Sequence, residues 1–177
     1  MLSNDTYNHS AEKYGCRIRI PHLVYNKVKE MVYVNKVVDI LNQQLSDWNL
    51  LFVKLHNYHW NVKGSDFFTL HEKFESLYKE STLHIDEIAE RILALGAVPA
   101  GSFKAYLELS TLEEATENES PRQMVEQIVM DFKSVVASAK EGIQLAGDVG
   151  DETTVDLLTQ IHVSLEKHIW LFTAFLG

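Results

Sequence analysis

Residues 59–99 read HWNVKGSDFFTLHEKFESLYKESTLHIDEIAERILALGAVP, and the apolar periodicity predicts one long helix from about residue 65 to 95. Side chains of metal-binding type lie along this helix at helical spacing: His71, Glu75, Asp86 and Glu90. At about 100° per residue they fall at about 0°, 40°, 60° and 100°, within one quadrant of the helix surface. The large apolar residues centre on the adjoining face. The ligand stripe therefore runs along the edge of a core-facing helix.

The axial spacing divides these four side chains into two pairs. His71 and Glu75 lie one turn apart, as do Asp86 and Glu90, and the two pairs are separated by about 16 Å at a rise of about 1.5 Å per residue. Metal–ligand bonds are about 2.0–2.6 Å long, so one ion cannot contact both pairs of a single chain. If two copies pack antiparallel about a two-fold axis, the first pair of one chain faces the second pair of the other. The spacing thus predicts a site that belongs to a dimer.

Together with His59, these positions form the pattern H-x(11)-H-x(3)-[DE]-x(10)-D-x(3)-E, which resembles the Dps family of DNA-protection-during-starvation miniferritins. The flanking segments HNYHWNVKG, FFTLHEKFE, DEIAERILALG and HIWLFTAFLG are similar to the same family, and the similarity runs from about residue 34 to 177. The resemblance implies an all-α, ferritin-like four-helix bundle with a short extra helix in the long crossover connection. It also implies assembly into a hollow twelve-subunit shell. The expected activity is oxidation of Fe(II), preferably by hydrogen peroxide, with storage of the iron and protection of DNA from oxidative damage.

The resemblance assigns the ferroxidase and iron-binding roles to His59, His71 and Glu75 of one subunit, with Asp86 and Glu90 of the partner subunit. Carboxylates and imidazoles suit Fe(II) and stabilise Fe(III) once it has formed. The third ligand is usually Asp in this family and is Glu75 here. The longer side chain keeps the charge and the oxygen donors, and it can reach further or rotate away.

Helical patterns also precede and follow the quoted stretch. Apolar residues repeat at three and four from residue 34, and Gly64 is a plausible C-terminal cap. Ser120-Pro-Arg-Gln123 is typical of a capping box with proline at the first helical position. A long connection that contains a short helix fits a ferritin-like bundle, in which one loop runs the length of the bundle. The expected ranges are 34–64, 65–95, 103–109 for the short helix, 120–147 and 151–175.

Composition narrows the class of protein. The 177 residues suffice for one domain with a sizeable core, and the net charge of −9 argues against wrapping nucleic acid over the whole surface. The single cysteine, Cys16, excludes an internal disulfide and fits a reducing cytosol. The first residues lack the apolar segment of a signal peptide, and no stretch of about 20 apolar residues could span a membrane. We expect a cytoplasmic protein, with nucleoid association a further expectation.

Residues 1–31 are expected to form an N-terminal tail that is partly helical, followed by the bundle at residues 32–177. This segment holds five basic residues against three acidic ones, a net charge of +2 in an otherwise acidic protein. Twelve basic tails on a shell could bind DNA phosphates with avidity. The alternative is a solvated or interface-packed arm with ordinary lysines. The first interpretation is slightly favoured because Dps-like proteins often use their tails in this way.

Other acidic residues have two interpretations each. Glu152 and Asp156 lie at the start of the last predicted helix, where carboxylates stabilise the helix dipole. The resemblance implies instead that they line a three-fold pore that draws in Fe(II), and this is the favoured interpretation. Glu72 and Glu80 lie off the ligand stripe and are expected either to face the cavity and nucleate mineral or to form a solvated helix face.

Three aromatic side chains near the stripe remain. Trp60 is expected in the core, although an aromatic beside a redox site can also donate an electron. His56 and His84 lack matching partners and are interpreted as structural or surface residues.

Two other classes of protein compete with the ferroxidase. A conventional ferritin or di-iron oxygenase holds its metal inside one bundle through Glu-x-x-His pairs, and the chain contains no Glu-x-x-His. A DNA-binding nucleoid protein with a weak or vestigial iron site stays open because of Glu75 and the basic tail. An iron-free helical bundle would require five matched ligand positions to be coincidental.

Overall fold

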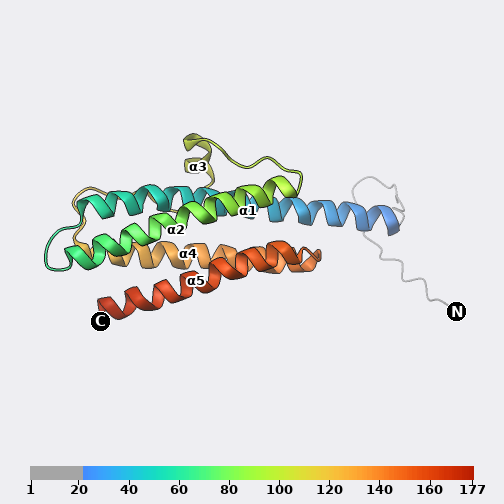
Figure 1. The fold of residues 1–177 in the computed structure, drawn as a ribbon. Coiled ribbons are helices and arrows are strands. Elements are labelled where there is room, and N and C mark those ends of the chain that lie inside the picture. Colours follow the sequence, from blue (N-terminus) through green and yellow to red (C-terminus); the bar gives the residue numbers. More distant parts are fainter. Residues whose placement is uncertain (1–21) are drawn as a thin grey trace, which may run out of the picture.

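The structure is a computed structural model that describes residues 22–177, with side chains described from residue 31 onward. These residues form helices and no strand. Four long helices lie along one another, and the short α3 sits on the crossover at the side of the bundle (Figure 1). The elements are α1 (His22–Asn61), α2 (Phe67–Ala94), α3 (Phe103–Leu109), α4 (Pro121–Asp148) and α5 (Glu152–Leu176). The predicted ferritin-like bundle with an extra helix in the long crossover is confirmed.

The first helix is longer than the apolar pattern indicates. It begins at His22 and runs without interruption for 40 residues, so the short helix expected before residue 32 is continuous with the first bundle helix. No glycine or proline lies between residues 22 and 63, which leaves nothing in the sequence to break the helix. Residues 1–21, with Cys16 and most of the predicted tail, lie outside the described residues. The division at residue 31 stays a prediction.

The helix ends follow the local sequence. Ser120 Oγ accepts a hydrogen bond from Gln123 N at 3.3 Å, and Gln123 Oε1 accepts one from Ser120 N at 2.9 Å, so the capping box is confirmed. Asp151 caps α5 by accepting from Thr154 N at 3.1 Å. Gly64, which adopts a φ of 101° in the turn between α1 and α2, supplies a backbone conformation that residues with a Cβ rarely adopt.

The core lies between the four long helices. On α1 most of the predicted apolar repeat is buried, including Leu41, Leu45 and Leu55, which are each 1 % exposed or less. At Gly142 of α4, an added Cβ would lie 2.5 Å from Leu158 Cδ1 of α5. A larger residue there would require the Leu158 side chain to move.

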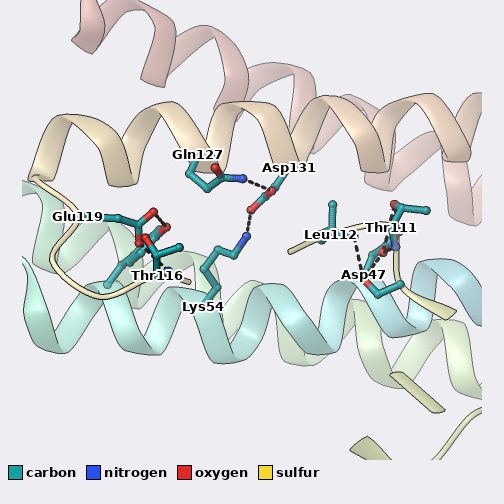
Figure 2. Close-up of polar contacts among 10 residues, drawn as sticks. Asp47, Lys54, Thr111, Leu112, Thr116, Glu119, Gln127 and Asp131 are labelled. Atoms are coloured by element: carbon teal, nitrogen blue, oxygen red, sulfur yellow. Dashed lines mark hydrogen bonds and ion pairs between the residues drawn. The ribbon is translucent and has the colours of Figure 1, made fainter. Parts of the chain in front are cut away.

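Polar side chains also cross the core, along one face of α1 (Figure 2). Lys54, 1 % exposed, reaches from α1 to Asp131 on α4, with 2.6 Å between Nζ and Oδ2, and Gln127 Nε2 donates to the other carboxylate oxygen at 2.9 Å. The interior of the bundle is therefore bridged by an ammonium–carboxylate pair. Tyr58 donates to Glu119 at 2.8 Å.

A further carboxylate on α1 fastens the crossover. Asp47 accepts hydrogen bonds from Ser110 Oγ at 2.6 Å and from Thr111 N at 2.7 Å (Figure 2). Burial raises the pKa of Asp47, and the hydrogen bonds from Ser110 and Thr111 act in the opposite direction. The segment between α3 and α4 is thus held against α1 at both of its ends, near Ser110 and near Glu119.

Candidate metal site

Two of the predicted ligands are brought together where α1 ends and α2 begins. The rings of His59 and His71 stack with 3.7 Å between centroids and 20° between planes. His59 Nδ1 lies 2.9 Å from the backbone oxygen of His71, and His71 Nδ1 lies 2.8 Å from the backbone oxygen of His59. Each histidine therefore orients the other through its main chain.

This reciprocal contact determines which ring nitrogen can bind a metal. A carbonyl oxygen only accepts, so Nδ1 must carry the hydrogen in both rings. In a neutral ring the lone pair is then on Nε2, and no hydrogen bond within the described residues engages Nε2 of His59 or His71. Metal-binding histidines characteristically donate their other ring N–H to a carbonyl or carboxylate, which fixes the tautomer and the ring orientation. Both rings have that arrangement.

Glu75 lies one turn along α2 from His71, and its carboxylate is turned toward Lys79. Lys79 Nζ donates to Glu75 Oε1, and the side chains of Glu75 and Lys79 are 37 % and 64 % exposed. The hydrogen bond and the charge of Lys79 hold the pKa of Glu75 below its ordinary value of 4.5, and the charges of His59 and His71 act in the same direction. Glu75 is therefore an ionised oxygen donor beside the two imidazoles.

Asp86 and Glu90 are exposed and lie further along α2. Among residues 31–177, no three His, Cys, Asp or Glu side chains approach closely enough to hold a metal ion. The structure thus brings His59 and His71 together, places Glu75 next to them, and leaves Asp86 and Glu90 apart from them on the same helix. The donors themselves, two imidazole nitrogens and three carboxylates, are of the type that binds Fe(II).

The aromatic surroundings differ from the prediction in one respect. Trp60 is 69 % exposed in the single chain, so its expected place in the core is wrong. Tyr58, two positions earlier, is fully buried, and about 200° of helical rotation puts Trp60 on the opposite side of α1. Tyr78 presents its edge to His59, with 5.4 Å between centroids, and stacks on His56 at 3.8 Å. His56 is therefore a packing residue behind the site.

Of the two interpretations of each residue, the solvated helix face is wrong for Glu80, and His84 is structural and not a surface residue. Glu80 accepts from His168 Nε2 at 2.8 Å and from Ser164 Oγ, both on α5. Burial acts to raise the pKa of Glu80, but hydrogen bonds from His168, His84 and Ser164 hold it well below its ordinary value. The side chain of His84 is 12 % exposed and packs on Trp48 at 4.5 Å between centroids. Glu72, which the sequence analysis considered together with Glu80, is exposed.

At the start of α5 the acidic residues separate into two kinds. Asp151 forms an ion pair with Arg91 at 2.6 Å. Burial acts to raise the pKa of Asp151, but hydrogen bonds from Arg91 and Thr154 keep it below its ordinary value. Glu152, in the first turn, and Asp156, one turn later, are exposed. Asp151 therefore serves the fold, and Glu152 and Asp156 are the carboxylates available for another role.

Sequence reasoning missed the contacts that orient the donors. The mutual hydrogen bonds of His59 and His71 run through the main chain and leave no pattern in the sequence. The pairing of Lys79 with Glu75 has a signal, because residues four apart on a helix are neighbours.

The chain is similar in sequence and in structure to known proteins. The ferritin-like domain family matches residues 38–177. DNA protection during starvation protein 2 of Bacillus anthracis is 52 % identical over 142 residues, which are 80 % of this chain and 97 % of the relative. The crystal structure of a Dps protein from Bacillus brevis superposes with a TM-score of 0.81 at 46 % identity, over 82 % of this chain and 98 % of that one.

A more distant structure places the fold in a wider group. Dps from Vibrio cholerae, described as a member of a broad superfamily of ferritin-like diiron-carboxylate proteins, superposes with a TM-score of 0.80 at 35 % identity, over 82 % of this chain and 92 % of that one. Within the described residues, none of the helices has the length and apolar character needed to cross a membrane.

Proposed function

Since the chain belongs to the Dps family of ferritin-like proteins, we propose that it oxidises Fe(II) with hydrogen peroxide at sites shared by two subunits and stores the product as a ferric mineral. By consuming both iron and peroxide, this activity would protect DNA from oxidative damage. The observation that carries the proposal is the reciprocal orientation of His59 and His71, which leaves both Nε2 lone pairs free, with Glu75 one helical turn from His71. The substrate iron would be held by these three residues and by Asp86 and Glu90 of the partner subunit.

Each donor has a distinct task in this mechanism. His59 and His71 bind Fe(II) as neutral ligands, in an orientation that their main-chain hydrogen bonds set in advance. Glu75 turns from Lys79 to the metal, and the partner's carboxylates complete the site with negative charge that favours Fe(III) over Fe(II). Two Fe(II) ions supply the two electrons that break the O–O bond of one peroxide. Both oxygens then leave as water or enter the oxide, so no hydroxyl radical is released.

The proposal includes a shell and its entry route. A homo-oligomer, by family resemblance a dodecamer, would enclose the mineral. Exposed carboxylates at Glu152 and Asp156 would form a pore that attracts Fe(II), and Glu72 would help to nucleate the mineral on the inner surface. We place the protein in the cytoplasm, where free iron and DNA coexist.

Direct DNA binding is a second part of the proposal, and it depends on the basic N-terminal residues. The net charge of −9 for the whole chain disfavours DNA contact over the shell surface, so the contact would be confined to the tails. The alternative function, a nucleoid protein with a weak iron site, would keep DNA contact and lose oxidation.

The test compares two double variants that each remove one imidazole and one carboxylate. His71→Ala with Asp86→Ala should reduce peroxide-driven Fe(II) oxidation, followed by ultraviolet absorbance without oxygen, to the rate in buffer. His162→Ala with Glu166→Ala, a pair 2.9 Å apart on α5, should oxidise iron at the wild-type rate. A sizing run should show the same particle for all three proteins. Wild-type oxidation by the first double variant would refute the site, and loss of the particle would show that these residues are structural.

A further inference from the structure

Among residues 31–177, Lys79 is the one cation that forms an ion pair with a proposed ligand. Its Nζ donates to Glu75, and no other side chain of residues 31–177 donates a hydrogen bond to that carboxylate. Measured from His71, Lys79 falls at about 80° around the helix, inside the quadrant of about 0–100° that the ligands occupy. The lysine therefore lies on the same side of α2 as the proposed ligands, and its side chain is 64 % exposed in the single chain.

The position of Lys79 along α2 follows from the antiparallel arrangement of the two chains. If Glu75 faces the partner subunit's Asp86 and His71 faces the partner's Glu90, the two-fold axis crosses α2 midway between these positions, near residues 80 and 81. Lys79 then lies about 2 Å along the helix from the level of the axis, and about 6 Å from the level of Glu75. Its long side chain can reach Glu75 or the partner's Asp86, which face each other.

The proposed shared site is negatively charged, and Lys79 lies beside it. Each site gathers three carboxylates: Glu75, and Asp86 and Glu90 of the partner subunit. Without a metal these like charges repel one another across the interface. Lys79 is the cation placed to offset them.

We propose that Lys79 is a resident counter-cation of the shared site, which stabilises the metal-free dimer and competes with the metal for Glu75. The proposal rests on the proposed function and specifies how that site behaves before iron arrives. A dication that binds Glu75 shares the carboxylate with the Lys79 ammonium, and the two positive charges repel each other there. Loss of the Lys79 charge therefore has two effects of opposite sign: weaker association of the metal-free chains and tighter binding of metal.

The experiment uses the full-length protein and Co(II) as a probe that resists oxidation in these conditions. Affinity is measured by titration calorimetry, and association of the metal-free protein is measured by sedimentation in the presence of a chelator. Lys79→Gln should bind Co(II) about two- to fivefold more tightly and dissociate at a severalfold higher protein concentration, the scale expected for an exposed ion pair. Lys79→Arg, which keeps the charge, should match the wild type in both measurements.

A matched control separates this effect from a general change in net charge. Lys104 forms an ion pair with Glu108, also four residues away, at 3.8 Å on α3, so Lys104→Gln removes the same charge from another pair. It should leave Co(II) affinity unchanged. An increase in affinity as large as that of Lys79→Gln would overturn the proposal, as would weaker association of Lys79→Gln without tighter Co(II) binding.

A fourth variant, His71→Ala, distinguishes failure of this proposal from failure of the proposed function. If His71→Ala abolishes Co(II) binding and Lys79→Gln binds as the wild type does, the role of Lys79 is overturned and the site stands. If His71→Ala leaves Co(II) binding intact, the site and the role of Lys79 are both overturned.

Discussion

The ion pair between Lys54 and Asp131 makes a prediction about the stability of the bundle. Both side chains are at most 4 % exposed, and Gln127 is the remaining donor to the carboxylate. Lys54→Met removes the ammonium and leaves a buried carboxylate without its counter-charge. Breaking a buried pair from one side costs about 3–5 kcal/mol of unfolding free energy. For a chain of this length that corresponds to a fall in Tm of about 6–20 °C.

Removing both partners should have a much smaller effect. Lys54→Met combined with Asp131→Leu leaves no uncompensated charge, and such replacements of a buried pair by apolar residues are often neutral or stabilising. The double variant should therefore be more stable than Lys54→Met alone. This non-additivity distinguishes the cost of an unpaired charge from a loss of packing around the lysine stem.

The assay is urea unfolding followed by circular dichroism at one protein concentration, because association contributes to apparent stability. The matched control is Lys140→Met, which removes an ammonium 3.8 Å from Glu166 in a pair whose side chains are both 57 % exposed. It should cost less than about 1 kcal/mol. The reasoning is refuted if Lys54→Met costs no more than Lys140→Met, or if the double variant is as unstable as the single one.

Two further predictions concern acid stability and DNA. The pKa of Glu80 lies well below its ordinary value of 4.5. Burial acts to raise this pKa, but the hydrogen bonds from His168, His84 and Ser164 lower it by more than burial raises it. The ionised Glu80 carboxylate therefore stabilises the fold fully above about pH 4.5, and this stabilisation is lost as the pH falls through the depressed pKa. The difference in unfolding free energy between the wild type and Glu80→Gln should accordingly become smaller in acid. A difference that stays constant from pH 7 to pH 2 would contradict this. Deleting residues 1–31 should abolish salt-sensitive retardation of DNA in gels, and unchanged retardation would exclude the tail as the DNA contact.

Local sequence signals predicted most of the fold because each helix has clear ends. The helix expected at 65–95 is α2 at 67–94, between Gly64 and Gly96, which both adopt positive φ. The helix expected at 103–109 matches α3, and the capping box opens α4. The start of α1 was missed because no stop signal separates residues 22–33 from the bundle helix. An amphipathic pattern marks the residues that face the core, and a helix can continue beyond them.

The contacts between distant residues could not be predicted in this way. Lys54 and Asp131 are 77 positions apart, and each alone resembles an ordinary charged residue on a helix. Trp60 was misplaced because hydrophobicity alone does not decide which side of α1 a residue occupies next to Tyr58. The proposed ligand set stays a prediction, and its sequence signal is that four of its members repeat at one turn on α2. The orientation of His59 and His71 has no such signal because it depends on their main-chain contacts.

A site divided between two chains links metal binding to association. Under the proposed function, neither half-site of a chain supplies all five donors, so a metal ion that binds at the interface also holds the two chains together. By mass action, binding at a concentration of 100 times Kd stabilises the complex by about 2.7 kcal/mol. The same carboxylates oppose association when the metal is absent, and a cation such as Lys79 limits that cost. Under the proposed function, the shell would then be able to assemble before iron is present, and the site would still bind iron in preference to the lysine.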